Sequence, residues 1–171
     1  MKILLIASLV TVIGASVAIA GPSGHGEENK DNGTQGHGSG GHAGMMETGM
    51  PGQASQVNRT IEVTMSETDD GEMIYTPKDF DIKKGETIRF SVTNKGELEH
   101  EFILDTMERN AMHKEAMSQQ MESHKSPNAI TLEPGEKGEI IWTFGNSGTF
   151  EVACLIPGHY ESGMFGKVAV N

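Results

Sequence analysis

The part of the sequence that most restricts the fold begins at about Val57 and continues to the end of the chain. Short runs of alternating apolar and polar residues follow one another there, separated by turn-forming stretches such as Lys83-Lys84-Gly85 and Asn94-Lys95-Gly96. About seven such runs are expected to form strands, which is typical of a β-sandwich and disfavours βαβ units. Residues 57–171 are enough to bury a single core.

Residues 1–20 have the pattern of an export signal. Lys2 supplies a positive start, an apolar run follows, and Ala18-Ile19-Ala20 is a small-x-small cleavage site. An uncleaved membrane anchor is the alternative, but the break at Gly21-Pro22 favours cleavage. We therefore expect a periplasmic protein, exported through the general route, with no membrane insertion after cleavage.

Residues 21–56 consist mainly of Gly, His, Ser, Asn and Met, as in "GHGSGGHAGMMETGM". Such a composition buries too little apolar surface to offset the entropy of ordering, so we predict a disordered tail. The formal net charge of the whole chain is −11. This charge disfavours nucleic acid as a partner and favours cations and basic proteins.

The strand alternation brings a cysteine and a histidine to the core side of the predicted sandwich. In "GTFEVAC", Cys154 shares a face with Phe150 and Val152; in "LEHEFIL", His100 shares a face with Phe102. Taken singly, these residues would be interpreted as an inert buried cysteine and a satisfied core histidine. Cys154 is the only cysteine, so it has no internal disulfide partner.

The segment "CLIPGHYESGM" adds two more metal-binding side chains, His159 and Met164, at regular intervals after Cys154. Two imidazoles and a thiolate with a weak axial thioether make up the electron-transfer copper site of blue copper proteins. Zinc also accepts Cys and His but gains little from a thioether, so Met164 favours copper.

The sequence resembles the cupredoxins, the small blue copper proteins, over residues 57–171. The resemblance rests on "TPKDFDIKKGETIRFSVTN", "HEFIL" and "TFEVACLIPGHYESGMFGKVAV", and the Cys-x4-His-x4-Met loop is similar to that of longer-loop members such as rusticyanin and auracyanin. It implies an all-β, eight-stranded Greek-key β-sandwich with one type 1 copper. His100, Cys154 and His159 would be its equatorial ligands and Met164 its axial ligand. Many cupredoxins have asparagine directly after the first histidine ligand, whereas this chain has Glu101.

An insertion at residues 105–126 separates two predicted strands and has the pattern of a helix rich in Met and His. Its His113, Met117, Met121 and His124 fall within about 80° of one another on one face. These side chains and those of the tail are suited to weak binding of additional Cu(I). A methionine stripe that packs on the sandwich is the alternative explanation. The candidate secondary copper ligands are His25, His37, His42, Met45, Met46, Met50, His113, Met117, Met121 and His124.

The predicted function is periplasmic copper handling by an exported, redox-active copper protein, since the chain resembles copper-tolerance cupredoxins with a Met/His-rich extension. The alternative is a soluble single-electron carrier between redox proteins. The expected partners are copper ions and either a copper exporter or a redox protein. We expect no enzymatic activity, because the sequence contains neither a second cupredoxin domain nor a His-x-His pair.

Overall fold

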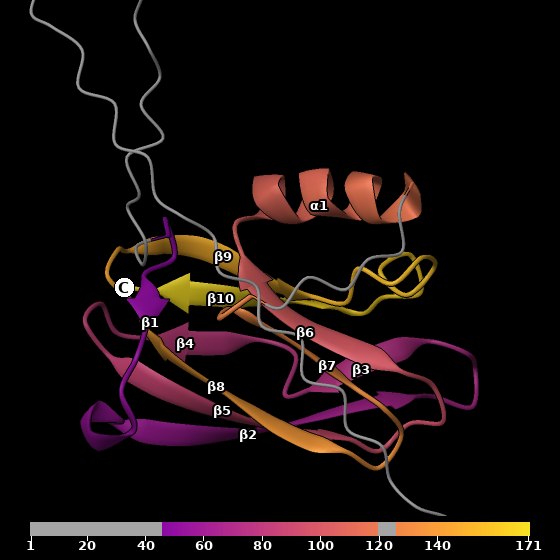
Figure 1. The fold of residues 1–171 in the computed structure, drawn as a ribbon, viewed down its shortest axis with the longest axis horizontal. Helices are drawn as coiled ribbons and strands as arrows, with labels where there is room; N and C mark the ends of the chain where they lie inside the picture. Colours follow the sequence, from indigo (N-terminus) through magenta and orange to yellow (C-terminus); the bar gives the residue numbers. More distant parts are fainter. Residues whose placement is uncertain (1–45, 120–125) are drawn as a thin grey trace, which may run out of the picture. The chain divides into compact units, whose positions relative to one another are not determined.

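The computed structural model describes residues 46–119 and 126–171, and the predicted export signal and most of the predicted tail lie outside these ranges. The described residues form two five-stranded sheets that face each other, together with one helix (Figure 1). The first sheet has the order β1 (Met50–Pro51), β8 (Lys137–Thr143), β5 (Thr87–Asn94), β2 (Arg59–Glu67), β3 (Met73–Thr76). The second has the order β4 (Phe80–Ile82), β10 (Phe165–Val170), β9 (Gly148–Ala153), β6 (His100–Asp105), β7 (Ala129–Leu132).

The strand pairing confirms the predicted β-sandwich. Two pairs are parallel, β2 with β5 and β4 with β10, and the remaining pairs are antiparallel. The alternating residues of each strand meet between the sheets, where Phe90 and Phe102 lie with ring centroids 5.3 Å apart and Trp142 is fully buried. Within the described residues, no helix is both long enough and apolar enough to cross a membrane.

All of β6 and the last four residues of β9 are buried on both faces, because the inserted helix α1 (Met107–Gln119) packs on the outside of their sheet (Figure 1). Alternation along the strand correctly turns Glu151 and Ala153 away from the main core. They are nevertheless buried, and Ala153 joins Ile103 and Leu155 in a second apolar cluster. The helix thus covers β6, which begins with the first histidine, and β9, which ends just before the cysteine.

The helix begins after β6, with the Thr106 side chain accepting a hydrogen bond from the backbone N–H of Arg109 (3.2 Å). The presence of α1 confirms the predicted helical insertion over residues 107–119. Asp105, where we expected the insertion to begin, is the last residue of β6. The expected end of the insertion falls partly on residues 120–125, which lie outside the described ranges.

The predicted tail boundary at residue 56 needs correction. Met50 and Pro51 pair with Thr143 and Trp142 of β8, and a short 3-10 helix, Ala54–Gln56, follows. Gly49 has a φ of 137°, and a Cβ atom there would clash with the carbonyl oxygen of Thr143. Glycine at this position therefore allows close packing against β8, whereas the composition of the segment predicted disorder.

Candidate metal centre

Three of the four predicted ligands converge at one end of the sandwich. His100 is the first residue of β6, Cys154 directly follows β9, and His159 lies in the ligand loop, residues 155–164, which joins β9 to β10. One ligand atom from each of the three lies within 4.8 Å of the other two. His100 and Cys154 are fully buried, and His159 is 9% exposed.

The ligand atoms face one another closely. The Nδ1 atoms of His100 and His159 are 3.2 Å apart, and Sγ of Cys154 is 3.4 Å from Nδ1 of His159. All three are atoms that bind borderline and soft transition metals. The arrangement brings His100 together with Cys154 and His159, which lie more than 50 residues further along the chain.

Met164 belongs to the same structural unit. Its backbone carbonyl accepts a hydrogen bond from the N–H of Cys154 (3.0 Å), and its own N–H donates to the carbonyl of His159 (3.1 Å). The Met164 side chain is fully buried in the core cluster that also contains Cys154. The backbone thus ties the predicted axial ligand directly to two equatorial ones.

The ligand loop is shaped by two glycines and by tight turns. The backbone N–H of His159 donates to the carbonyl of Ile156 (3.0 Å), which closes the turn at Pro157-Gly158. Gly158 and Gly163 have φ angles of 90° and 99°, which other residues rarely adopt. This turn returns His159 to the end of β9.

Cys154 is prepared for a bound cation. The backbone N–H of Glu101 donates to its Sγ at 3.3 Å, an interaction that favours the thiolate. Burial nevertheless raises the pKa of the Cys154 thiol to about 12 when no metal charge is present. A metal cation would supply the positive charge that this buried sulfur lacks.

Glu67 is a site residue that the sequence did not reveal. Its Oε1 atom lies 2.8 Å from Nε2 of His100, and the backbone N–H groups of Glu97 and Leu98 donate to the same carboxylate at 2.9 and 3.0 Å. Burial raises the pKa of Glu67, but the hydrogen bonds from Glu97, His100 and Leu98 outweigh it and leave the pKa lowered. The ionised carboxylate assigns the His100 proton to Nε2, so that the Nδ1 lone pair faces the cluster.

Glu101 connects the first histidine to the ligand loop. Its carboxylate accepts a hydrogen bond from the backbone N–H of Leu155 (3.3 Å) and one from the Thr131 hydroxyl (3.4 Å). Burial raises the pKa of Glu101, and these hydrogen bonds oppose the rise. The residue that departs from the expected asparagine thus ties His100 to the segment after Cys154.

The donor set fits copper. His159 has a pKa lowered by burial and by the neighbouring His100, so its imidazole is neutral and free to donate a lone pair at neutral pH. Two imidazoles and a thiol surround one point that is shielded from water. A cation there would relieve the close approach of their lone pairs, and this mixture of nitrogen and soft sulfur suits copper.

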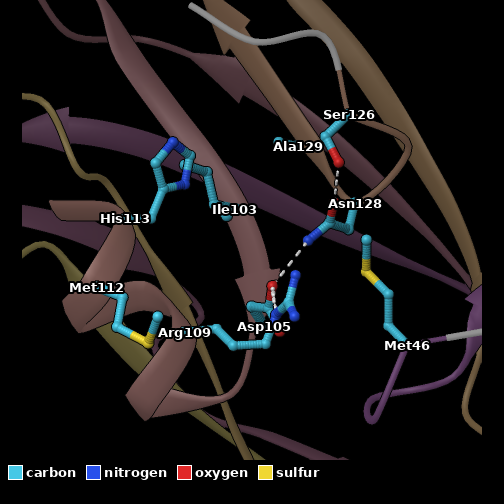
Figure 2. Close-up of a pocket in the computed structure, with 9 residues that line it drawn as sticks. All are labelled: Met46, Ile103, Asp105, Arg109, Met112, His113, Ser126, Asn128 and Ala129. Atoms are coloured by element: carbon cyan, nitrogen blue, oxygen red, sulfur yellow. Dashed lines mark hydrogen bonds and ion pairs between the residues drawn. The ribbon is translucent and has the colours of Figure 1, made fainter. Parts of the chain in front are cut away.

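Among the described residues, no candidate secondary ligand belongs to a cluster of His, Cys and carboxylate ligand atoms like that of His100, Cys154 and His159. Met46 and His113 line one pocket of about 430 Å³, and Met112 lines it as well (Figure 2). The pocket also contains the ion pair between Arg109 and Asp105 (3.0 Å), and Figure 2 shows the Met46 and Met112 side chains on opposite sides of this pair. A guanidinium cation in the pocket opposes binding of another cation.

The other secondary candidates are divided between the described residues and the rest of the chain. Met50 lies at the surface on β1, and Met117 is buried with 8% of its surface exposed. Packing on the sandwich therefore accounts for Met117, whereas Met107 and Met112 are exposed. The candidates outside the described residues are His25, His37, His42, Met45, Met121 and His124.

Comparisons with known proteins agree with this geometry. The family model of copper-binding proteins of the plastocyanin/azurin family matches residues 61–171. The copper-resistant cuproprotein CopI of Rubrivivax gelatinosus is 43% identical over 124 residues, covering 72% of this chain and 73% of the relative. The CopI protein of Pseudomonas aeruginosa is 34% identical over 153 residues, covering 72% and 82%.

Among solved structures, the reduced auracyanin of Roseiflexus castenholzii superposes with a TM-score of 0.56. It is 24% identical to this chain and covers 67% of it and 98% of the auracyanin, which supports the fold. The matched family region includes all four predicted ligands, from His100 to Met164. The chain therefore belongs to the plastocyanin/azurin family of copper-binding proteins, the cupredoxins.

Proposed function

We propose that the protein holds one redox-active copper ion at His100, Cys154 and His159, with Met164 as the axial ligand, and handles copper in the periplasm. The observation that carries this proposal is the buried convergence of the His100, Cys154 and His159 ligand atoms within 4.8 Å. When bound, copper would supply one-electron chemistry between Cu(I) and Cu(II). The names of the CopI relatives support a role in copper resistance.

The ligand residues would carry out this function through their rigidity. His100 is held by Glu67, Cys154 by the N–H of Glu101, and the ligand loop by the Glu101 carboxylate. Because these supports do not depend on the metal, both oxidation states would meet nearly the same ligand positions. Little rearrangement on gain or loss of an electron is the property that a reversible redox site requires.

We further propose that the Met and His residues of the tail and of α1 capture additional Cu(I) weakly. The support is their soft ligand chemistry and the exposure of Met107 and Met112, which packing does not explain. The test is a deletion of residues 21–45, which leaves the ordered segment 46–56 in place. We expect less copper bound per chain under reducing conditions and an unchanged coloured site, and an unchanged stoichiometry would contradict the role of the tail.

The role in copper tolerance is tested in a host that lacks the gene. Growth on copper should be restored by the wild-type chain and not by Cys154→Ser, and cell fractionation should place the protein in the periplasm. Full rescue by Cys154→Ser would show that the copper site is not needed for tolerance.

A single-electron carrier is the second candidate function. It is favoured by His159, the most exposed of the three clustered ligands, and by Phe165, which is 36% exposed and stacks on Tyr160, the residue after His159; together they offer a contact surface for a redox partner. A carrier should exchange electrons rapidly with a donor protein, with rates that fall as salt screens the acidic surface. Slow exchange that is independent of salt would favour copper handling.

A further inference from the structure

Helix α1 contacts the part of the ligand loop that directly follows His159. Nζ of Lys114 lies 2.8 Å from Oε1 of Glu161 and 4.4 Å from the centroid of the Tyr160 ring. One lysine of the helix therefore binds two consecutive loop residues, one through charge and one through the face of an aromatic ring. Figure 1 shows the C-terminal half of α1 above this loop.

A second connection runs through a buried carboxylate. The Glu151 side chain accepts one hydrogen bond from Nδ2 of Asn110 in α1 (3.1 Å) and one from the hydroxyl of Tyr160 in the loop (3.0 Å). Glu151 and Asn110 are both buried. Because a buried carboxylate needs its donors, this contact joins the helix, β9 and the loop more firmly than an exposed ion pair would.

A cavity of about 340 Å³ lies at the start of the loop. Met117 of α1, which is buried, lines this cavity together with Ile156 and Pro157. The helix thus contacts the loop through Lys114 and, by way of Glu151, through Asn110. Two of the clustered ligands, His100 and Cys154, belong to or border strands, so His159 is the one on a segment that can move away.

We propose that α1 is a latch on the ligand loop, with Asn110 and Lys114 holding His159 closed over the copper and thereby limiting the rate of copper exchange. His100 and Cys154 are fully buried and His159 is 9% exposed, so the closed loop covers copper held between them. Release therefore requires the loop to lift, which breaks the contacts of Lys114 and Tyr160. This inference rests on the proposed copper occupancy of the His100, Cys154 and His159 site.

The test measures transfer of Cu(I) from the ascorbate-reduced, copper-loaded protein to excess bathocuproine disulfonate. Lys114→Leu removes the ion pair and the cation–π contact, and leucine avoids the new thioether that methionine would introduce. We expect copper transfer to be about three- to tenfold faster, the range that such contacts support. Lys114→Arg keeps the charge, so copper transfer from this variant should be about as fast as from the wild type.

The matched control is Lys84→Leu, which makes the same change of charge at an exposed turn residue away from α1. Tyr160→Phe keeps the ring and removes only the hydroxyl that donates to Glu151, and it should also accelerate copper transfer. Equal rates in the wild type, Lys114→Leu and Tyr160→Phe would overturn the latch, as would equal acceleration by Lys84→Leu. If the wild-type protein takes up no copper at this site, the proposed function itself fails, which is a different result.

Discussion

The ligand loop and helix α1 both carry histidine and methionine, but they place them differently. In the loop, Met164 is fully buried and His159 meets His100 and Cys154 at a single point. In the helix, Met107 and Met112 are 56% and 67% exposed, and the pocket beside His113 contains an ion pair. The difference teaches that the same residue types are buried and convergent in one region and exposed in the other, and burial and convergence are what favour tight metal binding.

The two regions also differ in the hydrogen bonds that hold their metal-binding side chains in place. Two of the three clustered ligands are held by groups outside the loop: His100 by the Glu67 carboxylate and Cys154 by the Glu101 N–H. We therefore expect one tightly held copper at the loop and weak, exchangeable copper at the helix. The following predictions weaken the loop site in steps, from the largest expected effect to the smallest.

Replacing Cys154 by serine should lower the copper affinity of the loop site to that expected for the helix. The substitution removes the thiolate, and with it the charge-transfer colour. Affinity for Cu(II) should fall by more than about a hundredfold, since loss of an outer hydrogen-bond partner alone costs about ten- to a hundredfold. Visible spectroscopy and a chelator competition measure both effects, and a variant that keeps the colour would contradict the assignment of Cys154.

The copper affinity of the loop site should rise with pH. Burial raises the pKa of the Cys154 thiol to about 12, so at neutral pH the metal-free site holds a proton that the copper-bound thiolate has lost. Binding therefore releases a proton, and the affinity should increase about tenfold per pH unit between pH 7 and pH 9. Competition titrations at three pH values check this, and an affinity independent of pH would mean that the thiol is not a ligand.

Glu67→Gln should weaken the loop site without removing a ligand. Loss of the carboxylate at Nε2 makes the His100 imidazole less basic, so Cu(II) affinity should fall about tenfold and the reduction potential should rise. The control is Glu62→Gln, the same change of charge at an exposed position of the same strand. If both variants shift the potential equally, the effect is one of net charge and not of the hydrogen bond to His100.

Met164→Leu should have the smallest effect on binding. The colour should remain, because the thiolate is retained, while the reduction potential should rise because the weak axial donor is lost. We expect Cu(II) affinity to change only about two- to fivefold. Protein-film voltammetry gives the potential. If both potential and spectrum match the wild type, Met164 is a core residue and not an axial ligand.

The sequence predicts the loop region well because the patterns that define this region, strand alternation and ligand spacing, involve residues close together in the chain. Alternation in "GTFEVAC" places Cys154 at the inner end of β9, and the Pro-Gly turn predicts the return of the chain toward β10. The burial of His100 follows from the same rule. Strand periodicity and ligand spacing are short-range properties, so a single sequence is enough to read them.

The contacts made by tertiary packing could not be read in this way. Glu67 lies 33 residues from His100, and nothing in its surroundings marks it as a partner. Glu151 is buried because α1 covers it, a packing that alternation along the strand does not encode. Gly49 lies in a segment with the composition of a disordered tail, yet its lack of a side chain is what allows the chain to approach β8 closely.

The most direct test of the central claim is a titration of the purified metal-free protein with Cu(II), recording the visible spectrum and the copper bound per chain. The account predicts an intense thiolate band that saturates at one copper, with further copper binding weakly and mainly under reducing conditions. Saturation without any thiolate band would contradict it, because it would mean that His100, Cys154 and His159 do not bind the metal together.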